Sequence, residues 1–348
     1  MGSPRRMCAR GASLILAGAF FFGGCGPRSR VLTVLYTNDI HATCHPLKAT
    51  WIEGSPPVGG FVALERELTR ARVPGRETLL VDSGDLLSGG PLGGLIYAGV
   101  KGGHMIRFLR ALKYDAMAVG NHDFDHGVDN LASAAERASF PFLAANVHAR
   151  DGGLLVEPGW VILRRGGLRV GIIGLVTPSV RQLVSRKTAA RFTVEAPAEV
   201  GDSLARLLDP RTDLLVVLSH CGLETDRFLA RRLGPTVDLI VGGHSHDLLE
   251  TPERQNEVLI VQAGSRLRHL GRLDLIVQND RIAGFEASMT LLRDTASPGH
   301  EPTAVAALAD SLDAVLEASF GDTVCRLEAA LTRSYHREST LGNWVADA

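Results

Sequence analysis

Residues 114–125, YDAMAVGNHDFD, combine a buried strand with a cluster of polar side chains, and this combination decides the fold. The run 115–119 is apolar almost throughout, which is typical of a strand buried on both faces of a sheet. Gly120 follows and permits a tight turn, after which residues 121–123 offer amide, imidazole and carboxylate groups. The segment therefore predicts a strand whose carboxyl end carries metal ligands.

The same pattern recurs in four other places. Further apolar runs span residues 31–36, 78–81, 213–218 and 237–241. The polar clusters that follow them are Asn38-Asp39-Ile40-His41, Gly84-Asp85, Ser219-His220 and Gly242-Gly243-His244-Ser245-His246. Ligands in open α/β sheets gather at the carboxyl ends of the strands, so we expect the five loops to meet at one edge.

The residue types in these clusters indicate which ions they suit. Oxygen and imidazole ligands without paired cysteines favour two hard or borderline divalent cations over a structural zinc site. Two clusters carry ligands at i and i+2, namely Asp39 with His41 and His244 with His246. An extended segment would point both members of such a pair to one side, so each pair could grip one metal.

With these motifs the chain resembles the 5'-nucleotidases of the calcineurin-like metallophosphoesterase superfamily. The resemblance covers about residues 31–297 and is carried by TNDIH at 37–41, VDSGD at 81–85, residues 114–125 and VGGHSH at 241–246. It implies an α/β fold of four layers, an α/β/β/α sandwich in which two sheets pack face to face. Residues 333–348 resemble only the start of the family's second, nucleotide-binding domain.

The resemblance also implies a role for each ligand position and two divalent metal ions, zinc, manganese or cobalt. Asp39, His41 and His246 would hold the first metal, Asn121, His220 and His244 the second, and Asp85 would bridge them. A hydroxide between the metals would attack phosphorus in line. His122 would protonate the leaving oxygen while Asp125 orients its imidazole ring. Several nucleotidases carry an amide in place of His246, which leaves the metal preference open.

Other side chains compete for these roles. Asp82 lies close enough in sequence to be an alternative bridging ligand, and Asp123 is interpreted as a supporting or surface carboxylate. Cys44 and Cys221 could form a disulfide at the metal edge, which would leave Cys325 single. Seven histidines outside the clusters are interpreted as structural or surface residues: His45, His104, His126, His148, His269, His300 and His336.

Composition and the N-terminus bear on partners and location. The chain has 37 Lys plus Arg against 38 Asp plus Glu and no basic block, which argues against nucleic-acid binding. Residues 1–24 have a positive start and an apolar stretch too short to span a bilayer, as in a lipoprotein-type signal peptide. We expect cleavage before Cys25, a lipid on Cys25 that anchors the chain to a membrane, and a place in the bacterial cell envelope, periplasmic or on the outer face. An ordinary signal peptide cut nearby is the alternative.

The remaining sequence completes the domain plan. Residues 25–30 form a linker, 31–297 the catalytic domain, 298–332 a linker with a bridging helix, and 333–348 the start of a truncated second domain. Helices are expected at 60–68, 104–113, 200–208 and 303–317. We interpret the chain as a fragment of a longer protein or a truncated product.

Three functions fit these observations. The first is hydrolysis of a small phosphate ester, with a nucleotide as the favoured substrate. The second is the related di-manganese thiosulfohydrolase chemistry of sulfur oxidation. The third is a lipid-anchored binding protein whose metal site is not catalytic.

Overall fold

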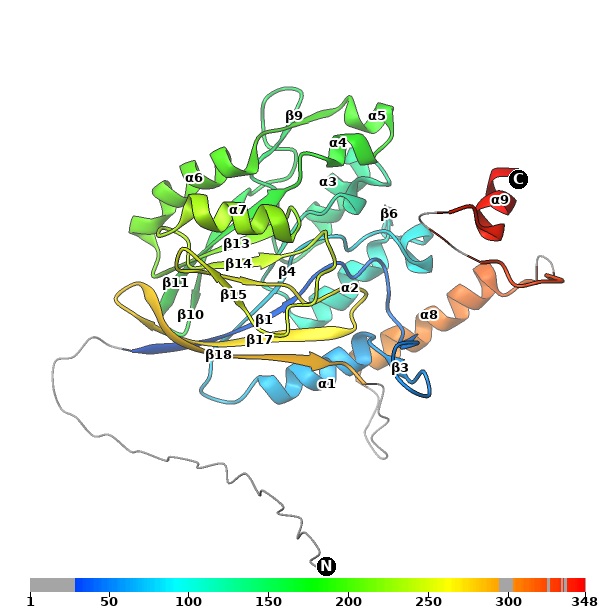
Figure 1. Ribbon diagram of the computed structural model, residues 1–348, viewed down its shortest axis with the longest axis horizontal. Helices are drawn as coiled ribbons and strands as arrows, with labels where there is room; N and C mark the ends of the chain where they lie inside the picture. The colour runs from blue at the N-terminus through cyan, green and yellow to red at the C-terminus, as the bar shows by residue number, and fades with distance from the viewer. Residues whose placement is uncertain (1–28, 294–302, 324–325, 333, 335–336, 348) are drawn as a thin grey trace, which may run out of the picture.

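The computed structural model describes residues 29–293, 303–323, 326–332, 334 and 337–347. The predicted signal segment 1–24, the predicted lipid attachment at Cys25, and Cys325, His300 and His336 lie outside these residues. Within them, two six-stranded sheets lie between layers of helices, with α6 and α7 on one side and α1 and α8 on the other (Figure 1). The predicted four-layer α/β/β/α sandwich is confirmed. In the part of the chain that the structure describes, no helix is both long enough and apolar enough to cross a membrane.

The first sheet contains the strands that end at the first three clusters. Its strand order is β18-β17-β1-β4-β7-β8. β1, β4, β7 and β8 run parallel, while β17 pairs antiparallel with β1 and β18 antiparallel with β17. The bounds are β1 (Arg30–Thr37), β4 (Thr78–Asp82), β7 (Ala116–Ala118), β8 (Phe142–Leu143), β17 (His269–Gln278) and β18 (Arg281–Leu291).

The second sheet carries the other two clusters. Its order is β10-β11-β13-β14-β16-β15, with β11, β13, β14 and β16 parallel and an antiparallel strand at each edge. The bounds are β10 (Trp160–Arg165), β11 (Leu168–Val176), β13 (Leu214–His220), β14 (Leu239–Gly242), β15 (Glu253–Gln255) and β16 (Val258–Val261). β13 extends through His220, so this side chain lies on the last residue of a strand and is fixed by the sheet itself.

The strands are rich in apolar residues because the two faces of each strand pack in different hydrophobic cores. In β1, Leu32 and Val34 face the core between the two sheets, whereas Leu35 faces the core under the helices. In β13, Val216 packs between the sheets and Val217 packs against the outer helices. Because successive side chains point to opposite faces, a strand covered on both sides is apolar at most positions, and the buried Thr33 is an exception in β1.

Amphipathic helices cover both outer faces. α1 (Phe61–Ala71), α2 (Gly103–Leu112), α3 (Val128–Arg137) and α8 (Ala304–Phe320) share the core of the first sheet, and α6 (Pro197–Leu208) and α7 (Leu223–Leu233) share that of the second. Phe61 of α1 stacks on Phe108 of α2 with ring centroids 4.3 Å apart. α8 packs against α1 and α2, and Val305 and Leu308 are among its buried residues; its role as a bridging helix stays a prediction.

Short elements complete the chain. They are β2 (Leu47–Lys48), β3 (Pro57–Val58), β5 (Ile96–Tyr97), β6 (Val100–Lys101), β9 (Val147–Ala149), β12 (Phe192–Val194), α4 (Val180–Leu183), α5 (Arg186–Ala189), α9 (Thr340–Asp347) and three 3-10 turns at Pro91–Gly94, His122–Phe124 and Asp209–Arg211. None of the described residues of α9 is buried. The interpretation of residues 333–348 as the start of a second domain stays a prediction.

The predicted disulfide between Cys44 and Cys221 is wrong. Both residues are buried free thiols. Cys44 packs in the core on the helix-covered face of the first sheet, and Cys221 packs in the corresponding core of the second sheet. The two sheets separate these cores, so the thiols cannot approach bonding distance.

A tight contact between β1 and β17 predicts the effect of one substitution. Gly271 pairs with Tyr36, and a Cβ at Gly271 would lie 2.0 Å from Cζ of the buried tyrosine ring. We expect Gly271→Ala to lower the free energy of unfolding by about 2 kcal/mol or more, because the ring has no room to move. Gly284→Ala is the matched control on β18, where the nearest atom would be 3.8 Å away. Urea unfolding followed by circular dichroism measures both, and equal losses would contradict the assigned contact.

Candidate metal centre

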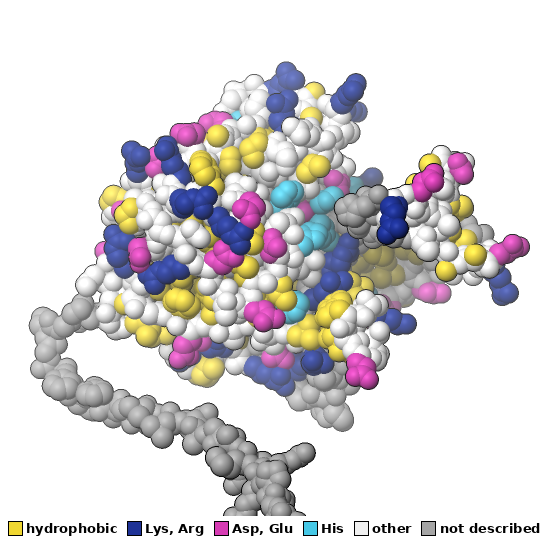
Figure 2. All heavy atoms as spheres, viewed as in Figure 1, with side chains coloured by type: hydrophobic (Ala, Val, Ile, Leu, Met, Phe, Trp, Pro, Cys, Tyr) yellow, Lys and Arg dark blue, Asp and Glu magenta, His cyan; other side chains and the backbone are white. Residues whose placement is uncertain are grey.

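The five predicted clusters meet at one edge of the sandwich. They follow β1, β4, β7, β13 and β14, whose carboxyl ends all lie on the same side. Figure 2 shows several histidine side chains gathered on this face of the molecule. Residues up to two hundred positions apart are therefore brought within contact distance, as the predicted strand ends required.

The first group of ligand atoms comes from the loops after β1 and β14. Asp39, His41 and His246 each offer one atom, and these atoms lie within 4.8 Å of one another. Nε2 of His246 is 3.1 Å from Oδ1 of Asp39, and Nε2 of His41 is 2.9 Å from Nε2 of His246. Two ring nitrogens and a carboxylate oxygen thus face a common point, as they would around a cation.

Asp85 lies between this group and a second one. Its Oδ2 atom is 3.8 Å from Nε2 of His41 and 3.2 Å from Nε2 of His220. Asp39, Asp85 and His220 also form a group whose ligand atoms lie within 4.8 Å of one another. The other oxygen, Oδ1, accepts a hydrogen bond of 2.7 Å from the backbone N–H of His122, which fixes the carboxylate plane.

Asn121 is the centre of the second group. Its Oδ1 atom lies 2.7 Å from Nδ1 of His244 and 3.2 Å from Nε2 of His220. Nδ1 of His220 is 2.6 Å from the carbonyl oxygen of Ser83 and donates to it, so in the neutral ring that binds a metal the lone pair is on Nε2, which faces Asn121 and Asp85. Ser83 was not predicted, because a backbone carbonyl gives no signal in the sequence.

The expectation of extended i, i+2 pairs is wrong. Asp39, His41, His244 and His246 all have left-handed backbones, with φ of 52°, 53°, 75° and 59°. His246 faces Asp39 and His41, whereas His244 faces Asn121, so one short segment serves both groups. The left-handed conformation is unfavourable for residues other than glycine, and such outliers cluster at functional sites.

Asn38 supports the first group in a way that the sequence did not reveal. Its Nδ2 atom donates to Oδ2 of Asp39 at 2.7 Å and to the carbonyl oxygen of Gly264 at 2.6 Å. Its Oδ1 atom accepts from the N–H of Ala263 at 2.7 Å. The buried amide therefore ties the ligand loop after β1 to the segment after β16. An amide next to a ligand is the only signal that could have suggested this role.

Two other carboxylates shape the loops. Asp123 is fully buried and accepts hydrogen bonds from the N–H groups of Leu86, Leu87 and Gly120 at 2.8–2.9 Å, so it supports the Asp85 loop and is not a surface residue. Asp82 accepts from Thr37 Oγ1 at 2.6 Å with one oxygen and from the N–H of Gly84 at 2.9 Å with the other. Asp82 belongs to neither ligand group, which removes the reason for considering it as the bridge.

His122 and Asp125 form a pair at the mouth of the cluster. Nδ1 of His122 donates to Oδ2 of Asp125 at 2.9 Å, and the same oxygen accepts from Oγ of Ser88 at 2.7 Å. The ring of His122 lies edge-on to that of His41 with centroids 5.2 Å apart, and its side chain is 45% exposed. The hydrogen bond that His122 donates to the Asp125 carboxylate raises the pKa of His122 above its ordinary value.

The charges in the cluster favour a cation. Burial would raise the pKa of Asp85, but the neighbouring His220 and His41 outweigh it and hold the carboxyl pKa well below its usual range. Burial would lower the pKa of His220, yet Asp85 and Asp39 outweigh it and raise that pKa to about 10. The buried carboxylates need positive charge close to them, and the donors around them are oxygen and imidazole groups without cysteine. Both features fit divalent metal ions.

Two of the described histidines outside the clusters form ion pairs away from the candidate metal centre. His45 pairs with Asp313 and His148 with Glu195, both at 2.8 Å. His269 differs, because it lines a cavity beside His246.

Comparison with known proteins agrees with this geometry. Residues 32–248 match the family described as calcineurin-like phosphoesterase, and the chain belongs to that family. Human 5'-nucleotidase is 27% identical over 377 aligned positions, which cover 99% of this chain and 64% of the human protein. The apyrase of Tabanus yao is 29% identical over 279 positions, covering 76% of this chain and 49% of the apyrase.

Solved structures show the same fold. The 5'-nucleotidase precursor from Thermus thermophilus superposes with a TM-score of 0.79 at 29% identity, covering 91% of this chain and 66% of that one. The sulfate thiohydrolase of the same organism superposes with a TM-score of 0.73 at 21% identity, covering 94% of this chain and 68% of that one. The chain spans 61–64% of the two nucleotidases from human and Diplobatis ommata.

The approach of Gly120 to Asp85 yields a prediction for metal binding. A Cβ at Gly120 would lie 2.1 Å from Oδ1 of Asp85 and 2.4 Å from its backbone nitrogen. We expect Gly120→Ala to displace the carboxylate and to reduce bound Mn²⁺ by about tenfold in affinity, a loss typical of a misplaced ligand. Gly94→Ala is the control, because nothing lies within 4 Å of its Cβ position. Equilibrium dialysis with metal analysis measures both, and unchanged binding in Gly120→Ala would refute the placement of Asp85.

Proposed function

We propose that this chain hydrolyses phosphoric monoesters and that nucleotides are its substrates. The observation that carries the proposal is the position of Asp85. One of its oxygens lies between two groups of metal-binding side chains, and the other is fixed by the backbone N–H of His122, the residue best placed to act as an acid.

Two divalent ions would be held by different side chains. Asp39, His41 and His246 would hold one ion, Asn121, His220 and His244 would hold the other, and Asp85 lies between the two groups. Two such ions, which we propose to be zinc, manganese or cobalt, polarise the phosphoryl oxygens and lower the pKa of a bound water. Asp85 and His220 are held by backbone groups, so the donors are preorganised before any substrate arrives.

His122 supplies the proton that the leaving group needs. Because its Nδ1–H is bound by Asp125, the proton on Nε2 is free to be donated to an ester oxygen. Ser88 holds Asp125 through Oδ2, which fixes the orientation of the pair. The ring of His122 is 45% exposed and can therefore reach a substrate, and no nucleophilic side chain is required.

Relatives support nucleotides as the substrate class. The proteins named 5'-nucleotidase and apyrase align with the catalytic part of this chain. The likeness to the sulfate thiohydrolase, at 21% identity, shows the fold alone and gives sulfur chemistry no separate support. Export by residues 1–24, anchoring through a lipid on Cys25 and a location in the cell envelope remain part of the proposal, supported by the sequence pattern.

The function is tested by hydrolysis of AMP with the Mn²⁺-loaded full chain. Activity that disappears in chelator and returns with metal supports the proposal. Absence of turnover with manganese, zinc and cobalt alike would favour the binding protein whose metal site is not catalytic.

A substitution at His122 tests its part in leaving-group protonation. We expect His122→Ala to reduce turnover of AMP by roughly 10²–10³-fold, because a ribose alkoxide is a poor leaving group without a proton. Turnover of p-nitrophenyl phosphate should fall by at most about tenfold, because nitrophenolate leaves unprotonated. His148→Ala, which removes an imidazole paired with Glu195 instead, is the control. An equal fall for both esters would assign His122 another role.

A further inference from the structure

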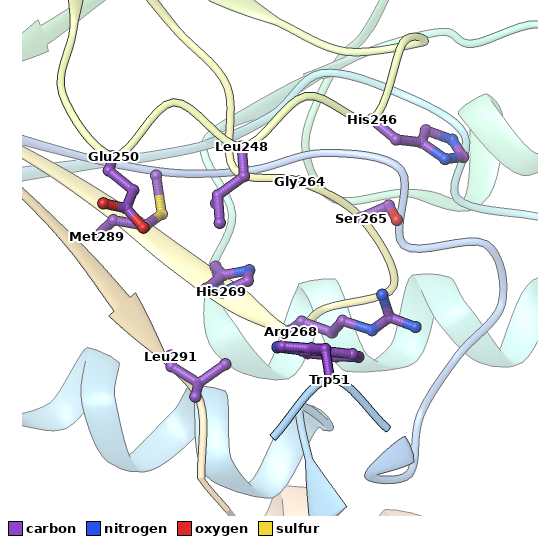
Figure 3. A pocket seen from close by; sticks show the side chains of 10 residues that line it. All are labelled: Trp51, His246, Leu248, Glu250, Gly264, Ser265, Arg268, His269, Met289 and Leu291. Carbon is purple, nitrogen blue, oxygen red and sulfur yellow. The ribbon is translucent and has the colours of Figure 1, made fainter. Parts of the chain in front are cut away.

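A cavity of about 720 Å³ opens beside the metal-binding cluster. It is lined by His246 at one side and by residues from the β2–β3 loop, the segments after β14 and β16, and the end of β18 (Figure 3). Cavities of this size hold ligands of the size of common metabolites. Because His246 belongs to both the cavity and the first ligand group, one molecule can contact the metal centre and fill the cavity.

Arg268 is the cation of this cavity. Its guanidinium group lies over the indole ring of Trp51, 4.6 Å from the ring centroid. Its Nε atom is buried without a hydrogen-bond partner, and among the described residues no carboxylate lies within ion-pair distance of it. A guanidinium carries five N–H donors in a fixed plane, and leaving the buried Nε–H of Arg268 unpaired is costly.

The surroundings of Arg268 make an anion the ligand that fits. Burial and the nearby Arg266 lower the pKa of Arg268, so both oppose its positive charge and an anion would relieve both. Trp51 holds the planar group by a cation–π contact, which presents its edge for bidentate binding of phosphate or carboxylate. His269 adds no competing charge, because burial lowers its pKa to about 4.

The cavity has opposite characters at its two ends. Figure 3 shows Arg268 and Ser265 on the side of His246, and Glu250 at the other end with Leu248 and His269 between them. An anion is therefore favoured next to the metal centre and disfavoured at the far end. The segment that carries Arg268 is held in place relative to the metal ligands, because the N–H of Arg266 donates to the carbonyl oxygen of Asp39 at 2.7 Å.

We propose that Arg268, supported by Trp51, binds a second anionic group of the substrate, so that the chain prefers phosphate esters that carry such a group next to the reacting phosphate. Nucleoside diphosphates carry such a group, because their reacting β-phosphate is joined to the α-phosphate by an anhydride bond and the nucleoside monophosphate is the leaving group. The inference rests on the proposed function, because it places the reacting phosphate at the metal centre. Arg268 is then a residue of substrate specificity supplied by the catalytic domain itself.

Binding of two matched phosphonates tests the proposal without turnover. Phosphonoacetate carries a carboxylate where ethylphosphonate has a methyl group, and neither is hydrolysed. With the Mn²⁺-loaded full chain, we expect calorimetry to show that Arg268→Ala weakens the binding of phosphonoacetate by about tenfold or more. A loss of this size is typical of a charge-assisted pair. Ethylphosphonate should change by less than about twofold, because only its phosphonate is bound.

Arg211→Ala is the matched control. The guanidinium of Arg211 lies 5.5 Å from the ring centroid of Trp160 in the same kind of stack. Arg211 is on the turn before β13, whereas the candidate ligand His220 is at the other end of that strand. It should alter neither probe. If Arg268→Ala does not fold, as judged by thermal unfolding, Arg268→Gln keeps most of the side chain and removes the charge. Equal losses for both probes, or none for phosphonoacetate, would overturn the proposal.

The outcomes separate this inference from the proposed function. If the chain hydrolyses no phosphate ester but binds phosphonoacetate through Arg268, the result supports the anion site and contradicts the proposed function. If the chain hydrolyses AMP and the Arg268→Ala variant binds phosphonoacetate as tightly as the unchanged chain, the result supports the proposed function and contradicts the anion site.

Discussion

The carboxylate of Asp85 is buried among imidazole rings, and its negative charge is the constraint on which the rest of the site depends. A buried charge is tolerated only when cations or donors surround it. His122 supplies a backbone donor, His220 and His41 supply ring nitrogens, and each comes from a different loop. The loops can approach only because Gly120 leaves room for the carboxylate. Convergence of separate strand ends is thus the condition for keeping Asp85 ionised inside the protein.

The same convergence couples the metal centre to the cavity beside it. Asn38 bonds both to Asp39 and to the segment after β16, and that segment continues into Arg268. A group bound at Arg268 is consequently held at a fixed place relative to the metal ligands. Positioning of this kind, by rigid parts of the catalytic domain, is what converts binding of a remote group into rate.

Much of the fold could be predicted because its signal is local. A strand covered on both faces is apolar at most positions, so residues 31–36 and 213–218 indicated β1 and β13 without knowledge of their neighbours. The possible disulfide could not be judged in this way, because its signal is not local. Cys44 and Cys221 are near ligands in sequence, but the side of the sheet on which each thiol packs depends on the whole sandwich.

The sequence alone identified the side chains that gather at the candidate metal centre, because Asp39, Asp85, Asn121 and the clustered histidines each follow a recognisable strand, and the alternation of strands and helices implied one shared edge. Through the family resemblance the sequence also implied how these side chains divide between two groups, and the tertiary structure supplied the backbone conformation that divides them. The left-handed backbone of His244 and His246 sends two neighbouring side chains to different groups, and no pattern of residue types encodes that turn. It also decided that Arg268 lies on Trp51 beside His246, since contacts between segments more than two hundred residues apart arise only when the sheets have packed.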